Sequence, residues 1–276
     1  MGASVHFEDL VNLMRRLREK GGCPWDIEQT HERLKQYLVE ETYEVIDAID
    51  SGDEDKLKEE LGDLFYQIIF HAQISEENGA FNMHDVLKLG MEKMTRRHPH
   101  VFGNSKDSNT KEVLEQWDEI KKKEKGHEDR KYVVDGVPKH LPALQKAQKI
   151  QKKVAKVGFD WTDIKDVIAK VEEEFAEFKA EINHIKDDMP PEAQTKSNIA
   201  AIEEELGDFF FAIVNLARFL KLDSEDVLQK AIHKFSKRFR GIEDELKANG
   251  KSIEDASLEE MDAAWNKVKL KPDTGC

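Results

Sequence analysis

Glu59-Glu60-Leu61-Gly62-Asp63-Leu64-Phe65 and Glu204-Glu205-Leu206-Gly207-Asp208-Phe209-Phe210 are the two stretches that decide the fold. Each stretch sets two carboxylates three residues apart and then continues into an apolar run. Residues at this spacing are neighbours on one face of a helix. The chain holds only 15 Gly and 7 Pro and shows no sustained alternation of apolar and polar residues. The sequence therefore predicts an all-α protein.

The two halves of the chain resemble each other. Four landmarks recur in the same order: Glu41-Thr-Tyr-Glu44, the first stretch, Lys93 to Arg97 and Trp117 in one half; Glu174-Phe-Ala-Glu177, the second stretch, Lys234 to Arg238 and Trp265 in the other. Such self-similarity indicates a duplicated structural unit. We expect two repeated helical-bundle domains.

A charge run and turn residues lie between the halves. Residues 121–140 begin with Lys-Lys-Lys-Glu-Lys-Gly and contain Asp135-Gly136 and Pro138, a composition typical of a linker. We predict an N-terminal domain over 1–125, a linker over 126–140 and a C-terminal domain over 141–276.

The composition excludes several classes of protein. The net charge of −14 argues against affinity built on basic contacts to nucleic-acid phosphates. The two cysteines, Cys23 and Cys276, cannot organise a disulfide scaffold or a thiolate zinc site. The most apolar stretch, 209–220, is too short to span a bilayer, and the first residues do not resemble a secretory signal. We expect a cytoplasmic protein without a nucleic-acid or membrane partner.

The repeated carboxylates suggest a metal site. E-x-x-E on one helix and E-x-x-D on the next can direct four oxygen ligands into one gap, and such ligands suit Mg²⁺ or Mn²⁺. A single E-x-x-E is common on solvated helices, but two copies, each followed by E-L-G-D, favour a site. Gly62 and Gly207 strengthen the case, because glycine inside a helix costs up to about 1 kcal/mol relative to alanine. Close approach of helices and a bound ligand both explain them.

Basic residues in the second half could serve a polyphosphate. Lys170 stands one turn before Glu174, while Lys234, Lys237 and Arg238 share a later helix. A metal-bound triphosphate needs cations around its outer oxygens. The alternative for any single one of these residues is a solvated surface side chain with no role in binding. Trp265 fits stacking on a base and packing in a core equally well.

Further motifs identify a family resemblance. Gly22-Cys23-Pro24-Trp25-Asp26 with Gln29-Thr30, Arg97-His-Pro-His-Val-Phe102 and Val157-Gly-Phe-Asp-Trp161, together with the carboxylate pairs, resemble the MazG nucleoside triphosphate pyrophosphohydrolases. The resemblance covers nearly the whole chain. It implies an all-α, usually dimeric enzyme that hydrolyses NTPs or dNTPs to the monophosphate and pyrophosphate with Mg²⁺.

The resemblance also implies roles for single residues. The metal ligands would be Glu41, Glu44, Glu60 and Asp63 in the first half, and Glu174, Glu177, Glu205 and Asp208 in the second. The nucleotide contacts would be Lys170, Lys234, Lys237, Arg238 and Trp265. Ala201 departs from the pattern, since some tandem members carry a Lys near this position. Glu173 is a candidate general base, and no catalytic residue is assigned. A non-catalytic nucleotide-binding or protein-interaction module is the alternative function.

Two expectations concern the whole molecule. The segment Leu206 to Leu220 is apolar almost all round, which predicts a helix buried on most sides and exceeds what a small bundle needs to bury; we expect a homodimer. We also expect the second half to carry most of the activity. Tyr37 stands where Lys170 is found in the second half, and Pro99 ends the first basic helix directly after His98.

Overall fold

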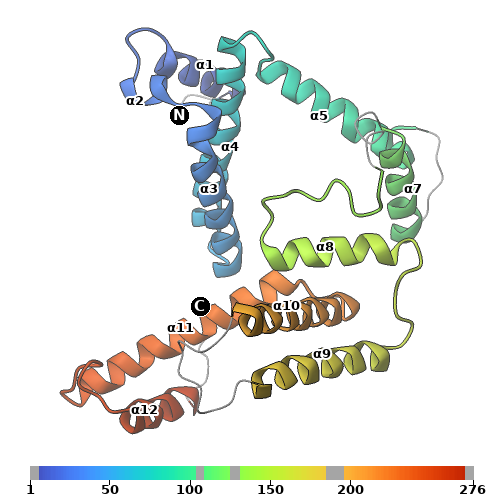
Figure 1. Cartoon of the computed structure of the whole chain (residues 1–276). Coiled ribbons are helices and arrows are strands. Elements are labelled where there is room, and N and C mark those ends of the chain that lie inside the picture. The colour runs from blue at the N-terminus through green and yellow to red at the C-terminus, as the bar shows by residue number, and fades with distance from the viewer. Residues whose placement is uncertain (1–5, 104–108, 125–130, 185–195, 271–276) are drawn as a thin grey trace. The chain divides into compact units, whose positions relative to one another are not determined.

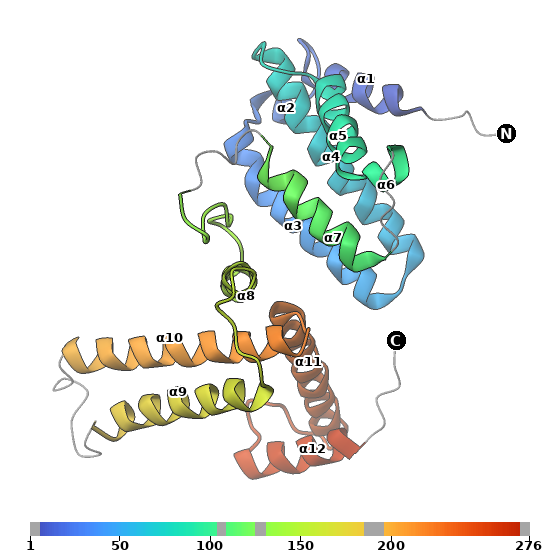
Figure 2. The same cartoon turned by 90° about the vertical axis from the view of Figure 1, so that its right-hand side faces the viewer.

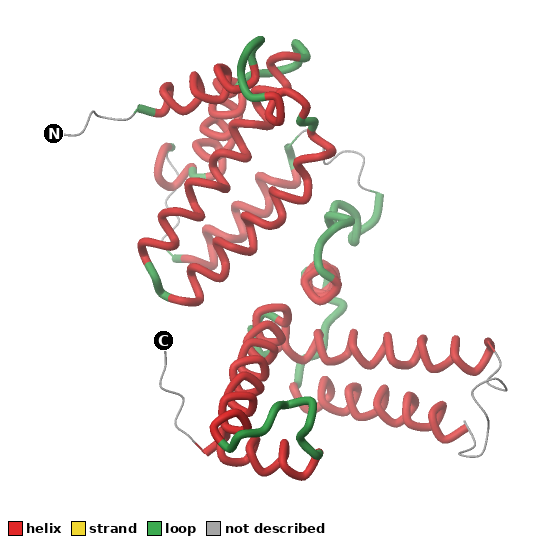
Figure 3. The backbone as a smooth tube through the Cα atoms, turned by 90° about the vertical axis from the view of Figure 1, so that its left-hand side faces the viewer, coloured by secondary structure: helices red, strands yellow, loops and turns green. Residues whose placement is uncertain are grey.

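The structure is a computed structural model that describes residues 6–103, 109–124, 131–184 and 196–270. Across these ranges every regular element is an α-helix (Figure 3), so the all-α prediction is confirmed. Contacts divide the chain after Glu124 into two compact units, each described by itself below. In the described ranges, no helix is both long and apolar enough to cross a membrane.

The first unit is built around a helical hairpin. Its helices are α1 (Phe7–Arg18), α2 (Pro24–Glu28), α3 (His31–Ser51), α4 (Glu54–Glu77), α5 (Met83–Arg97), α6 (Pro99–Phe102) and α7 (Thr110–Lys122). Helices α3 and α4 lie side by side (Figures 1 and 2). Between them Gly52 adopts a left-handed φ of 69°, and Asp53 caps α4 by accepting hydrogen bonds from the backbone N–H groups of Asp55 and Lys56. This turn fixes the register of the hairpin.

The core of the first unit lies at one end of this hairpin. It contains Val11, Met14, Leu34, Ile69, Phe70, Ala72, Ile74 and Met83. Arg18 of α1, with its side chain only 6% exposed, pairs with Glu77 of α4 at 2.7 Å. The same guanidinium donates to the backbone oxygen of Asp26. The ion pair therefore holds α1 and α2 against the last turn of α4.

Helices α5 and α7 are joined by a cluster of charges. The Glu124 carboxylate accepts hydrogen bonds from Arg96 at 2.7 Å and from Arg97 Nε at 3.0 Å. The Arg97 guanidinium also lies 5.3 Å from the ring centroid of Trp117. Helix α5 ends at Arg97, before Pro99, as the sequence predicts.

The second unit repeats the hairpin. Its helices are α8 (Ala143–Ala155), α9 (Ile164–His184), α10 (Lys196–Phe219), α11 (Ser224–Ala248) and α12 (Leu258–Leu270). Helices α9 and α10 lie side by side (Figures 1 and 2), and Val167 and Val214 are almost fully buried. Gln148 of α8 accepts hydrogen bonds from the backbone N and Oγ of Ser224, at 2.9 and 2.8 Å. This buried amide ties α8 to the first turn of α11.

Residues 131–142 contain no α-helix and connect to α8. Lys153 of α8 donates to the backbone oxygens of Val133 and Asp135, at 3.3 and 2.8 Å. This part of the expected linker is therefore attached to the second unit, while 126–130 lie outside the described residues. The domain limits at 125 and 141 stay predictions.

Helix α10 is less buried than its sequence predicts. Phe210, Phe211 and Ile213 are 53%, 45% and 40% exposed, while Ala212 and Val214 are buried. The expectation that Leu206 to Leu220 is buried on most sides is wrong for the single chain. The reason is that α10 has neighbours of its own unit on only part of its surface and a strongly apolar side chain at nearly every position.

Candidate metal and polyphosphate site

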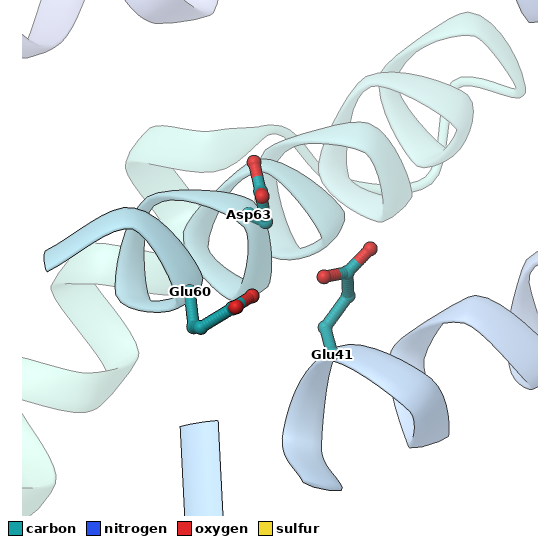
Figure 4. A group of neighbouring side chains, drawn as sticks. All are labelled: Glu41, Glu60 and Asp63. Carbon is teal, nitrogen blue, oxygen red and sulfur yellow. The ribbon is translucent and has the colours of Figure 1, made fainter. Parts of the chain in front are cut away.

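Three carboxylates converge between α3 and α4. Glu41, Glu60 and Asp63 each offer an oxygen, and these oxygens all lie within 4.8 Å of one another. Glu41 reaches from α3 toward the two side chains of α4 (Figure 4). Glu41 and Glu60 are half-buried and Asp63 is exposed. We call these three residues, with the neighbouring Glu44, the first centre.

The carboxylates of the first centre perturb one another. Partial burial raises the pKa of Glu41, and the charges of Asp63 and Glu44 raise it further, while a hydrogen bond from the Gln67 side chain opposes the shift. Burial also raises the pKa of Glu60, followed by the charge of Glu44, while the positive charge of Lys56 opposes the shift. Glu44 is exposed and lies outside the group of three, yet it is near enough to act on both. The carboxylates of this centre therefore repel one another, and Lys56 offsets only part of that repulsion at Glu60.

The second unit holds an equivalent group between α9 and α10. Oxygens of Glu174, Glu177 and Glu205 lie within 4.8 Å of one another. Glu174 is 8% exposed. Burial raises the pKa of Glu205, and the charges of Glu177, Asp208 and Glu174 add to the shift. We call Glu174, Glu177 and Glu205, with the neighbouring Asp208, the second centre.

Each centre thus gathers three of the four predicted residues and leaves one at its edge. The donor set is made of carboxylate oxygens only, which suits a hard divalent cation. In the first centre the Oε1 atom of Gln67 is buried and has no hydrogen-bond partner among the described residues. Both groups can therefore hold a metal ion.

Lys170 lies at the second centre, as the sequence predicts. Its Nζ atom is 2.7 Å from Glu174 Oε1 and 2.7 Å from Glu173 Oε1. These two hydrogen bonds raise the pKa of Lys170 above its ordinary value. The ammonium therefore stays charged and neutralises part of the second centre.

The other predicted substrate contacts share the two last helices. Arg238 of α11 lies 5.9 Å from the ring centroid of Trp265 on α12, and Phe235 lies 5.5 Å from the same ring. Lys234 and Lys237 are exposed on α11. Trp265 also packs beside a small core of Ile242, Leu246 and Ala264. It therefore has the contacts expected of a packing residue, and its stacking on a base stays a prediction.

The first unit contains the matching pair. Arg97 and Trp117 repeat the contact between Arg238 and Trp265, which supports the internal repeat at the level of single side chains. Glu124 binds Arg96 and Arg97 in the first unit. The first unit therefore neutralises two of its cations internally.

Sequence reasoning missed Gln67. Its side chain is 8% exposed and hydrogen-bonds to Glu41. It stands one turn after Asp63, on the same face of α4, so its position was readable from the spacing. A ligand pattern that contains only charged residues does not include it.

This chain is similar to several known proteins. The MazG nucleotide pyrophosphohydrolase domain matches residues 29–102 and 163–241, which contain both centres. A nucleoside triphosphate pyrophosphohydrolase/pyrophosphatase MazG of Thermotoga maritima is 45% identical over 97% of each chain. A nucleoside triphosphate pyrophosphohydrolase of Escherichia coli K12 is 44% identical over 94% of this chain and 95% of its own. A crystal structure of a mazG-related protein from Thermotoga maritima is 32% identical, covers 42% of this chain and 99% of its own, and has a TM-score of 0.37.

The match is duplicated, as the hairpins are. One segment of the family domain spans α3 and α4 with Glu41, Glu60 and Asp63, and the other spans α9 and α10 with Glu174, Glu177 and Glu205. The family domain matches two segments of the chain, each with its carboxylate centre, and relatives align with the chain over nearly its full length. The chain therefore belongs to the MazG nucleotide pyrophosphohydrolase family.

Proposed function

We propose that this chain hydrolyses nucleoside triphosphates, NTPs or dNTPs, to the monophosphate and pyrophosphate with Mg²⁺, which Mn²⁺ could replace. The observation that carries the proposal is the pair of carboxylate groups, each with three oxygens within 4.8 Å. The printed activities of the Thermotoga and Escherichia relatives support the substrate class. We infer that the enzyme works in the cytoplasm, where nucleotides are abundant.

The side chains of this protein would act mainly by positioning the metal ion and the phosphate groups. A bound divalent cation would neutralise phosphate charge and lower the pKa of a bound water. Glu174, Glu177, Glu205 and Asp208, and their counterparts in the first unit, would hold that cation. Lys170 would turn from Glu174 to a phosphate oxygen, and Lys234, Lys237 and Arg238 would bind the outer phosphates.

The reaction consumes one water. The water oxygen forms a bond to the α-phosphorus while the bond from this phosphorus to the α,β-bridging oxygen breaks, and pyrophosphate leaves. The water proton must pass to a base. Glu173 is a candidate because its carboxylate lies beside Lys170, next to the second centre, but the catalytic base is not assigned.

Two further features belong to the proposal. The chain would act as a homodimer, supported by the exposed apolar side chains of α10 and α11. The second unit would carry most of the activity, supported by Lys170 at its centre and by α11, which continues to Ala248 past its basic residues.

A product assay tests the reaction. Purified protein is incubated with each NTP and dNTP and Mg²⁺, and pyrophosphate and orthophosphate are measured separately. We expect pyrophosphate and the monophosphate as primary products, loss of activity with EDTA, and recovery with excess Mg²⁺. Primary release of orthophosphate would contradict the reaction class. Tight nucleotide binding without turnover would support the non-catalytic alternative.

A further inference from the structure

The two centres stabilise their most buried carboxylate in different ways. In the first centre the Gln67 side chain of α4 hydrogen-bonds to Glu41. In the second centre Lys170 of α9 binds Glu174 at 2.7 Å. When the E-L-G-D stretches are aligned, Ala212 stands where Gln67 is found, and aligning Glu41 with Glu174 places Tyr37 at the position of Lys170. The repeat has therefore exchanged a neutral amide on one helix for a cation on the other.

Gln67 leaves an oxygen free for a ligand. An ionised carboxylate only accepts hydrogen bonds, so Gln67 must present its N–H group to Glu41. Its Oε1 atom is then buried at the first centre, without a partner among the described residues. A buried carbonyl oxygen without a partner is unfavourable, and such an oxygen is a ligand that hard divalent cations accept. The first centre thus combines carboxylates with a neutral oxygen donor. Lys56 acts on Glu60 through its charge, but it does not make the direct contact with a carboxylate of its centre that Lys170 makes with Glu174.

Lys170 competes with a cation at the second centre. Its ammonium contacts Glu174, a carboxylate that would hold the metal ion, and its charge repels a divalent cation at short range. A polyphosphate removes this conflict, because its oxygens can bind Lys170 and the metal ion at once. The cation and the polyphosphate should therefore favour each other's binding at this centre, as linked ligands do.

We propose that Gln67 and Lys170 set the ligand preference of each centre: the first centre binds a divalent cation by itself, and the second binds the cation together with a polyphosphate. This assignment rests on the proposed function, since it requires that both centres bind metal. It makes Gln67 a metal-binding residue of the first centre alone. It makes Lys170 the residue that couples metal to substrate.

Binding of Mn²⁺ to the full-length protein tests the proposal. Titrations followed by electron paramagnetic resonance are run without and with inorganic triphosphate, and Glu41→Ala and Glu174→Ala assign each class of bound Mn²⁺ to its centre. Without triphosphate we expect one tighter class at the first centre. Gln67→Leu should weaken that class by about tenfold, while Lys170→Gln should tighten the second class by a similar factor. Triphosphate should tighten the second class in the original protein and much less in Lys170→Gln.

The controls distinguish a failure of this inference from a failure of the proposed function. Lys179→Gln, an exposed lysine on the same helix, should change neither class, and circular dichroism checks that every variant is folded. Equal affinities of the two centres without triphosphate, unchanged by Gln67→Leu and Lys170→Gln, would overturn the inference and leave the proposed function standing. Absence of Mn²⁺ binding at both centres, with and without triphosphate, would contradict the proposed function itself.

Discussion

Gly62 and Gly207 lie inside α4 and α10, where glycine is less favourable than alanine by about 1 kcal/mol. A Cβ atom built at either position meets no atom of the described residues within 4 Å. Packing of helices within one described unit therefore does not require these glycines. Close approach of helices within one unit does not explain the two glycines. A bound ligand still explains them, and so does contact with a second copy of the chain.

We expect alanine at these two positions to change the free energy of unfolding in the opposite direction from alanine at Gly241. We expect Gly62→Ala and Gly207→Ala to raise the free energy of unfolding by about 0.5–1 kcal/mol, because alanine restricts the unfolded chain and favours the helix. A Cβ at Gly241 lies 3.0 Å from Val268 Cγ1, so Gly241→Ala should lower it. Urea unfolding without metal or nucleotide measures all three. If Gly207→Ala lowered the free energy of unfolding, the space around Gly207 would not be open in solution, and contact with a second copy of the chain would explain the loss.

At the scale of elements, the contact between the end of α5 and the residues that follow α7 depends on the ionised form of Glu124. Hydrogen bonds from Arg97, and then from Arg96, lower the pKa of Glu124 from 4.5 to about 2. A carboxylate whose pKa is depressed in the folded state stabilises that state above its unfolded pKa. This contribution is complete above about pH 4.5 and is lost as the pH falls toward 2.

Glu124→Gln tests this pH dependence. We expect the variant to melt at a lower temperature than the original protein at pH 7, and the gap between them to shrink below pH 4.5. Calorimetry from pH 7 to pH 3 measures the gap. Glu115→Gln, on an exposed side chain of α7, is the matched control and should show little effect at any pH. A gap that is constant with pH would contradict the assignment to the charge of Glu124.

The sequence predicts helices better than it predicts which side chains meet. The spacing of the carboxylates predicted that α3 pairs with α4 and α9 with α10, and Pro99 predicted where α5 ends. Residues three apart are still separated by about 60° around the helix axis. The pairs Glu60/Asp63 and Glu174/Glu177 enter their groups of three together, whereas Glu44 and Asp208 do not join their partners, so the spacing alone does not decide which side chains converge. The rotation of each helix against its neighbour is set by core packing, which no local pattern records.

In the whole molecule, the two units should contribute unequally to catalysis. We expect Glu174→Ala with Glu177→Ala to lower kcat by about 100-fold or more, and Glu41→Ala with Glu44→Ala to retain most of the activity. The physical reason is the supply of cations: Lys170 stands at the second centre, whereas Glu124 binds Arg96 and Arg97 in the first unit. Steady-state kinetics on folded variants measures both. A larger loss in the first-unit variant would show that this order is wrong.

Exposed apolar side chains point to a second copy of the chain. Phe210 of α10 is 53% exposed, and Ile232 of α11 is 50% exposed. Large exposed apolar patches mark interaction surfaces. We expect a dimeric mass by sedimentation velocity at micromolar concentration, shifted toward the monomer by Phe210→Glu. Leu114→Glu, at a side chain of α7 that is 60% exposed, is the control. A strictly monomeric original protein would refute the dimer.

The turn at Gly52 and Asp53 has a consequence for chain entropy. Two residues join α3 to α4. A connection this short costs little entropy to close. The chain itself therefore holds the carboxylates of the first centre close together before any ligand binds.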